Sequence, residues 1–217
     1  MKIKIIPIGV LGTNCYVLSD ELTHKTVVID PGSKSEHLVQ YLENNHLVVT
    51  HIIITHGHFD HVGGVSWLIT ELNQRNQTTQ VVMSKAEKSI MEQKSDRKYH
   101  KLFFEADKDV MDGEIIDFGF VQLKALLVPG HTNYSMCFYS AENSCVFVGD
   151  TLFYHSIGTE AYYDGPAEDL SRNIQSILFA LPPETTVYPG HKRETTIEEE
   201  IKNNPYLSEA DTVDPWL

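Results

Sequence analysis

The sequence has few cysteines, little positive charge and no long hydrophobic run. Its three cysteines, Cys15, Cys137 and Cys145, form no close pair, so a disulfide framework is not expected and buried, reduced thiols are. The 17 Lys and Arg against 30 Asp and Glu give a formal net charge of -13, which disfavours nonspecific binding to nucleic acid or to an anionic membrane surface. No apolar run is long enough to span a bilayer, so no membrane partner is expected.

The chain length of 217 residues suits one domain, with boundaries 1–217 and a substantial core. The first 20 residues alternate and break at Pro7 and Gly9, whereas a signal peptide has an uninterrupted apolar core and a cleavage site. We therefore expect a cytoplasmic protein whose N-terminus forms a strand.

Hydrophobic periodicity predicts strands and helices that alternate along the chain, which is typical of an α/β fold. Strands are predicted at 2–10, 14–20, 26–30, 51–55, 79–84, 114–119, 120–128, 135–141, 144–149 and around 185–190, and helices at 33–46, 61–74, 85–95 and 167–181. The stretch 96–112 shows no clean period and is predicted to be a loop or an irregular helix.

The stretch "HIIITHGHFDHVGG", residues 51–64, places three histidines and an aspartate directly behind a run of isoleucines. Crowded imidazoles and a carboxylate repel one another when charged and waste polar groups when neutral, unless a metal ion binds them. His56 and His58 are two apart in extended chain and point the same way, while Asp60 and His61 begin the next helix and can point elsewhere. Four ligands in six residues can therefore serve two neighbouring metals.

Three more polar residues follow predicted strands: His131 in "PGHT", Asp150 in "GDTLF" and His191 in "YPGH". Taken singly, His131 suits a surface turn and Asp150 suits a turn cap. Taken with the cluster at 56–61, they complete a set of nitrogen and carboxylate ligands without cysteine. Such a set suits zinc, iron or manganese and disfavours a closed structural zinc site. The sequence therefore predicts a catalytic metal centre with open coordination positions.

In this order and spacing, the motifs "THGHFDH", "PGHT", "GDTLF" and "YPGH" resemble the metallo-β-lactamase fold superfamily, and within it the small bacterial glyoxalase II-like (hydroxyacylglutathione hydrolase-like) hydrolases. The resemblance covers nearly the whole chain, including "NCYVLSD", "VVIDPG" and "TTIEEEIKNNPYL". It implies a four-layer αββα sandwich of two mixed sheets flanked by helices.

The resemblance also implies the site and its reaction. The family pattern assigns one metal to His56, His58 and His131, the other to Asp60, His61 and His191, and the bridging position to Asp150. Two divalent ions are implied, with zinc expected and iron or manganese open. A metal-bound hydroxide would attack a small thioester or ester such as S-lactoylglutathione, and Asp60 would orient it and pass on its proton. Asp30 in "VIDPG" is expected to fix the tautomer of a histidine ligand.

The chain departs from this family at the substrate side. Full-length glyoxalase II has a C-terminal helical extension with basic residues for the glutathione carboxylates, and this chain ends 26 residues after His191, so no such extension is expected. Thr159 stands where relatives usually have Lys or Arg, while Tyr163 corresponds to their substrate-binding tyrosine. "GHKRETT" replaces the more common "GHGPETT" and brings Lys192 and Arg193 near the site, either to contact an anionic small-molecule substrate or to remain in solvent.

Three other functions compete with thioester hydrolysis. A persulfide dioxygenase of this superfamily binds one iron through two histidines and an aspartate, for which His56, His131 and Asp150 are present. The full set of seven ligands, and "GTEA" in place of a "GRTD"-like stretch, favour the hydrolase. Ribonucleases share the fold, but the acidic charge opposes RNA binding. A non-catalytic metal-binding protein would not need the complete ligand set. The physiological substrate, the metal and the oligomeric state stay open from sequence.

Overall fold

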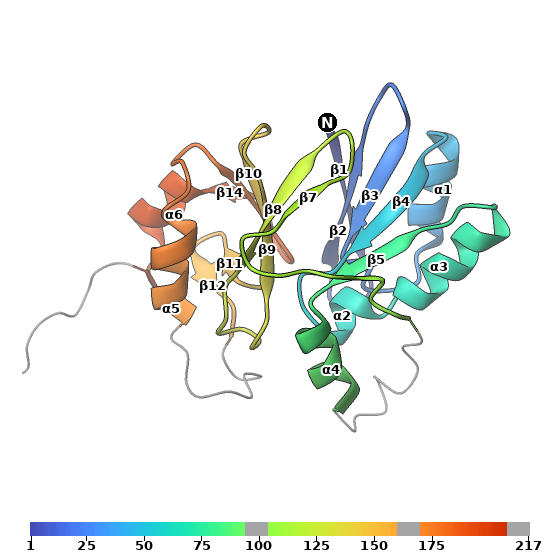
Figure 1. Ribbon diagram of the computed structural model, residues 1–217. Helices are drawn as coiled ribbons and strands as arrows, with labels where there is room; N and C mark the ends of the chain where they lie inside the picture. The colour runs from blue at the N-terminus through green and yellow to red at the C-terminus, as the bar shows by residue number, and fades with distance from the viewer. Residues whose placement is uncertain (94–103, 160–169, 208–217) are drawn as a thin grey trace, which may run out of the picture.

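A computed structural model describes residues 1–93, 104–159 and 170–207, and it contains two six-stranded sheets that face each other (Figure 1). The first sheet has the order β1 (Lys2–Ile8), β2 (Thr13–Ser19), β3 (Lys25–Ile29), β4 (Val48–Ile53), β5 (Gln80–Met83) and β6 (Lys108–Asp109). Its first three strands are antiparallel, and its strands from β3 to β6 are parallel.

The second sheet is also mixed. Its order is β14 (Thr195–Thr196), β13 (Thr186–Pro189), β10 (Cys145–Gly149), β9 (Met136–Ser140), β8 (Gln122–Leu127) and β7 (Ile115–Asp117). Strands β10 and β13 are parallel, and the other neighbours are antiparallel. A small antiparallel ribbon of β11 (Leu152–Phe153) and β12 (Ser156–Ile157) follows β10.

Helices form the outer layers. On the first sheet they are α1 (Glu36–Asn44), α2 (Phe59–Val62), α3 (Val65–Gln74) and α4 (Lys85–Gln93); on the second they are α5 (Leu170–Asn173), the π-helical turn η2 (Ile174–Leu178) and α6 (Ile197–Asn203). Figure 1 shows α1 and α3 covering the outer face of the first sheet and α5 and α6 beside the second. The predicted four-layer αββα sandwich of two mixed sheets is confirmed.

Alternation along the strands explains these layers. Val27 and Ile29 of β3 face the second sheet, while Val28 between them packs with Leu38 of α1. On the other side, Phe147 of β10 enters the layer between the sheets, and its neighbours pack beneath α5 and α6. Because successive strand side chains point to opposite faces, strands that are apolar throughout can contribute to two buried layers at once.

The three cysteines are buried and unpaired, as predicted. Burial raises the pKa of the Cys145 thiol to about 11, so this thiol stays protonated and unreactive at neutral pH. Among the described residues, no helix has both the length and the apolar character needed to cross a bilayer.

Some predicted element boundaries are wrong. The helix predicted at 61–74 is divided into α2 and α3 at Gly63 and Gly64, and position 64 requires glycine because a Cβ there would lie 2.4 Å from the carbonyl oxygens of Pro31 and Ser33. Of the stretch 96–112, residues 96–103 lie outside the described residues; the rest contains the short strand β6, which pairs with β5 through only two residues. In the helix predicted at 167–181, the N–H of Phe179 donates to the carbonyl of Ile174, so the later turns are π-helical.

Candidate metal centre

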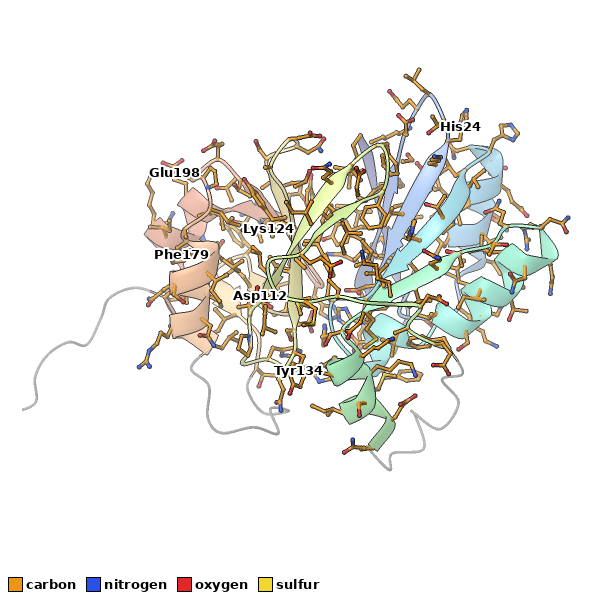
Figure 2. The ribbon with its side chains drawn as sticks, viewed as in Figure 1. His24, Asp112, Lys124, Tyr134, Phe179 and Glu198 are labelled. Carbon is orange, nitrogen blue, oxygen red and sulfur yellow. The ribbon has the colours of Figure 1, made fainter. Side chains whose placement is uncertain are left out.

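The seven predicted ligands all follow strands: five lie on loops, and Asp60 and His61 lie in the short helix α2. His56, His58, Asp60 and His61 follow β4, His131 lies between β8 and β9, and Asp150 and His191 follow β10 and β13. Figure 2 shows Tyr134, from the loop that carries His131, at the end of the sandwich opposite His24 of the β2–β3 turn. Carboxyl ends of parallel strands meet at one edge of a sheet, which is why separate motifs can converge there.

Three histidines form the first group. The distance from His56 Nε2 to His58 Nδ1 is 3.0 Å, and that from His131 Nε2 to the same His58 atom is 2.9 Å. Tetrahedral zinc with Zn–N bonds of about 2.0–2.1 Å holds its ligand atoms about 3.3 Å apart. The three ring nitrogens are therefore gathered at nearly the spacing that a single bound ion requires.

Asp60, His61 and His191 form the second group. Asp60 Oδ2 lies 3.1 Å from His191 Nε2 and 3.6 Å from His61 Nε2. The hydroxyl of Thr13 donates to the same Asp60 oxygen at 3.1 Å. The ligand atoms of this group lie within 4.8 Å of one another, as do those of the first group.

Asp150 lies between the two groups. Its Oδ1 is 3.3 Å from His61 Nε2, while its Oδ2 is 3.8 Å from His131 Nε2 and 3.5 Å from His191 Nε2. One carboxylate thus faces imidazoles of both groups, which is the placement expected of a shared ligand.

The surroundings of the first group favour the neutral form of its histidines. Burial, reinforced by the neighbouring rings of His61 and His58, lowers the pKa of His56 well below its usual value. Burial likewise lowers the pKa of His131. Since a metal binds the deprotonated imidazole, both histidines are already in the form that coordinates.

The second group is rich in carboxylates. Hydrogen bonds from His191 to Asp150 and Asp60 raise the pKa of His191 to about 9. Burial alone would raise the pKa of Asp60, but His191 and His61 outweigh it and lower this pKa to about 2. Burial disfavours the charge on Asp150 too, yet His61 and His191 hold its pKa well below the usual range. Both carboxylates are therefore ionised at neutral pH, as metal ligands must be.

A buried hydrogen-bond chain centred on Asp30 orients two of the histidines. His61 Nδ1 lies 2.8 Å from Asp30 Oδ2, and the Thr55 hydroxyl donates to the same oxygen at 2.6 Å. The Thr55 hydroxyl can in turn accept from His56 Nδ1, which is 3.1 Å away. In the neutral form of each ring, a proton on Nδ1 leaves Nε2 free of hydrogen and directed at the ligand cluster.

His131 is oriented by the main chain instead, since its Nδ1 lies 2.9 Å from the carbonyl oxygen of Thr159.

Glycines let the ligand loops approach one another. A Cβ on Gly190 would lie 2.2 Å from Asp150 Oδ1 and 2.7 Å from His61 Cε1. The glycine of "YPGH" therefore leaves the space that these two side chains occupy.

Two buried polar atoms without hydrogen bonds also indicate that the site fits divalent ions. His61 Nε2 and Asp150 Oδ1 are buried and form no hydrogen bond within the described part of the chain. Buried polar atoms nearly always have partners, and an ion between such a nitrogen and such an oxygen would satisfy both. All donors are imidazole nitrogens or carboxylate oxygens, which zinc, iron and manganese accept.

A family model described as the metallo-beta-lactamase superfamily matches residues 8–191. The chain belongs to this superfamily. Hydroxyacylglutathione hydrolase GloC of Haemophilus influenzae is similar at 29% identity, over 96% of this chain and 99% of that protein. The crystal structure of BLEG-1, a B3 metallo-beta-lactamase, has a TM-score of 0.83 at 29% identity and covers 95% of this chain and 100% of its own. TTHA1623, crystallised in a di-iron-bound form, has a TM-score of 0.78 at 32% identity, with coverages of 94% and 100%.

Members of the metallo-beta-lactamase superfamily are mostly metal-dependent hydrolases, and this chain is a metal-dependent hydrolase of that superfamily. Not all of the residues predicted to contact substrate lie within the described structure. Lys192 and Arg193 are exposed beside His191, whereas Tyr163 lies outside the described residues. His155 Nε2 lies 2.8 Å from Glu199 Oε1, on the α6 side of the molecule.

Sequence patterns did not single out two residues that contact the ligands, Thr55 and Thr13. Thr55 directly precedes His56 at the end of the isoleucine run, so its position was a usable signal. Thr13 reaches Asp60 across 47 residues of sequence, and no local pattern reports such a contact.

Proposed function

We propose that this protein is a dinuclear metal-dependent hydrolase of a small thioester, with S-lactoylglutathione or a related acyl thiol as substrate. The observation that carries the proposal is the position of Asp150, whose two oxygens face one imidazole of the first group and two of the second. Similarity to a hydroxyacylglutathione hydrolase over nearly the full length of both chains supports the substrate class.

The proposed sites divide the ligands as the two groups do. His56, His58 and His131 would hold one ion, Asp60, His61 and His191 the other, and Asp150 both. Zinc is the proposed metal, and iron is the first alternative because a similar protein was crystallised with two iron atoms. When bound, such ions polarise a thioester carbonyl and lower the pKa of water towards neutrality.

The residues of the chain supply positioning and charge. Ionised Asp60 accepts hydrogen bonds, so it can orient an attacking water as well as bind metal. Asp30 and Thr55 keep the imidazoles of His61 and His56 directed at the cluster. The thiolate that leaves is a stable anion and needs little help from an acid.

A mononuclear iron oxygenase would use His56, His131 and Asp150, which also lie together. It would leave Asp60, His61 and His191 without a role, although their ligand atoms lie within 4.8 Å of one another, as those of the first group do. The structure therefore favours hydrolysis over oxygenation.

The test measures metal content and two activities on one sample of freshly purified protein. About two metals per chain, cleavage of S-lactoylglutathione and no oxygen uptake with glutathione persulfide are expected for a dinuclear hydrolase. One iron per chain with oxygen consumption would refute the proposal. Two metals without turnover of any thioester would refute the substrate class alone.

A further inference from the structure

The residue directly after the ligand His191 has an unusual backbone. Lys192 has φ +66, in the left-handed region that residues with a Cβ adopt at a cost. Such conformations persist where surrounding contacts fix them, and they concentrate at functional sites. The fold therefore fixes the backbone at Lys192 and with it the point from which the side chain starts.

Asn14 supplies the contacts that fix this turn. Its side-chain N–H groups donate to the carbonyl of Lys192 at 2.8 Å and to that of Pro189 at 3.0 Å. Its backbone N–H donates to the carbonyl of Gly190 at 2.7 Å. The hydroxyl of Tyr16 donates to the Pro189 carbonyl as well, at 2.6 Å. Segment 189–192 is thus held from β2, far away in the sequence.

The Lys192 ammonium lies over the ring of Phe153, which is a neighbour of His191. Its Nζ lies 5.6 Å from the centroid of the Phe153 ring, and that ring lies 6.2 Å from the ring of His191. Within the described ranges, Lys192 forms no ion pair. A cation without an ion pair, one residue after the predicted ligand His191 and in a protein of net charge -13, can bind an anion near the ligand cluster.

Arg193 is placed differently. Its guanidinium carbon lies 3.5 Å from the centroid of Tyr154, whose ring stacks on His155 at 3.9 Å. The ring of His155 is bound by Glu199, whose carboxylate also interacts with the charge of Arg193. The Arg193 charge is therefore occupied in this stack, and Lys192 is the cation that remains available.

We propose that Lys192 determines substrate specificity by binding a carboxylate of the substrate, so that this enzyme prefers acyl thioesters that carry a carboxylate away from the scissile bond. This inference rests on the proposed thioester hydrolysis. A lysine is a compact charge on a flexible four-carbon stem, which suits a carboxylate whose distance from the thioester varies. In this chain the basic residue would come from the same loop as the predicted ligand His191.

The test compares two thioesters that differ by one charge. S-lactoyl-3-mercaptopropionate carries a carboxylate, and S-lactoyl-3-mercaptopropionamide is its neutral counterpart. The ratio of their kcat/KM values is measured for the wild type, Lys192→Gln and Lys192→Arg, all loaded with metal. Lys124→Gln, an exposed change of the same charge on β8, is the control.

The expected result is a three- to fivefold fall of the ratio in Lys192→Gln, from roughly the strength of an exposed ion pair. Lys192→Arg should keep the ratio, and Lys124→Gln should not change it. Added salt should lower the ratio only in proteins whose side chain at position 192 is positively charged. An unchanged ratio in Lys192→Gln would overturn the inference.

A binding measurement separates this inference from the proposed function. The non-hydrolysable thioether S-propyl-3-mercaptopropionate and its amide are titrated into the same metal-loaded proteins. Weaker binding of the carboxylate to Lys192→Gln without wild-type thioester turnover would refute the hydrolase and support the anion site. Turnover in the wild type with equal binding by both proteins would refute the anion site and support the hydrolase.

Discussion

Replacement of Asp30 by Asn tests whether the buried carboxylate controls metal affinity through histidine tautomers. The Asp30 side chain accepts three hydrogen bonds: from the backbone N–H of Thr55 at 2.9 Å, from the Thr55 hydroxyl at 2.6 Å and from His61 Nδ1 at 2.8 Å. Asn has nearly the same size, and it also tolerates the left-handed φ of +50 found here. The substitution therefore changes the hydrogen-bonding chemistry and little else.

The expected effect follows from counting donors. An amide offers one oxygen, so its NH₂ must replace one of the two accepting oxygens. If the NH₂ faces His61, the ring relieves the clash by moving its proton from Nδ1 to Nε2, and Nε2 can then no longer bind metal. Loss of such an outer partner lowers metal affinity about 10- to 100-fold. That range corresponds to about 1.4–2.7 kcal/mol of binding free energy.

The assay is competition for zinc against a chromophoric chelator, with thermal unfolding of the metal-free protein as a check on folding. Thr55→Val is the matched control, because it removes the hydroxyl near His56 and leaves the contact between Asp30 and His61 in place. We expect the control to weaken zinc binding less than Asp30→Asn does. A folded Asp30→Asn protein that binds zinc as tightly as the wild type would refute the tautomer argument.

Two further predictions concern Asp150 and Lys192. Asp150→Ala should lower both the zinc content and the thioester turnover, because Asp150 faces both ligand groups; full activity in this variant, measured with metal analysis, would exclude a shared ligand. Lys192→Gly should be about 0.5–1 kcal/mol more stable than Lys192→Ala in urea unfolding of the metal-free protein, because glycine avoids the cost of φ +66 but loses more chain entropy on folding. Equal stability of these two variants would show that the turn is not strained.

The fold and the convergence of the seven predicted ligands were predictable because their motifs follow runs of apolar, often β-branched residues. "HIIIT" before His56 and "CVFVG" before Asp150 predict buried strands, and buried strands of a mixed sheet bring their ends to a common edge. The structure places all seven predicted ligands together there. The two-residue offset of His56 and His58 also predicted side chains on one side, and their ring nitrogens lie 3.0 Å apart.

Other features had no local signal. At Gly63 and Gly64 the backbone of residues 31–33 approaches closely, and this contact exists only in the folded chain. Strand β6 depends on an edge pairing with β5, and the π-helical turn depends on how residues 174–178 pack on the second sheet. Helix propensity and periodicity describe single elements, so they could not predict any of these three features.

The contacts that complete the site link the two halves of the chain. Thr13, Asn14 and Tyr16 come from the N-terminal strands, yet they bind Asp60 and the carbonyls around His191. Without these hydrogen bonds, segment 189–192 would lack the partners that hold Lys192 at φ +66 and His191 against Asp60. The ligand motifs therefore specify which atoms can bind metal, while residues without metal-binding chemistry, near the start of the chain, determine whether the last ligand reaches the others. Although Asn14 is far from Asp60, His61 and His191 in the sequence, changes at Asn14 should accordingly disturb the geometry of this second ligand group.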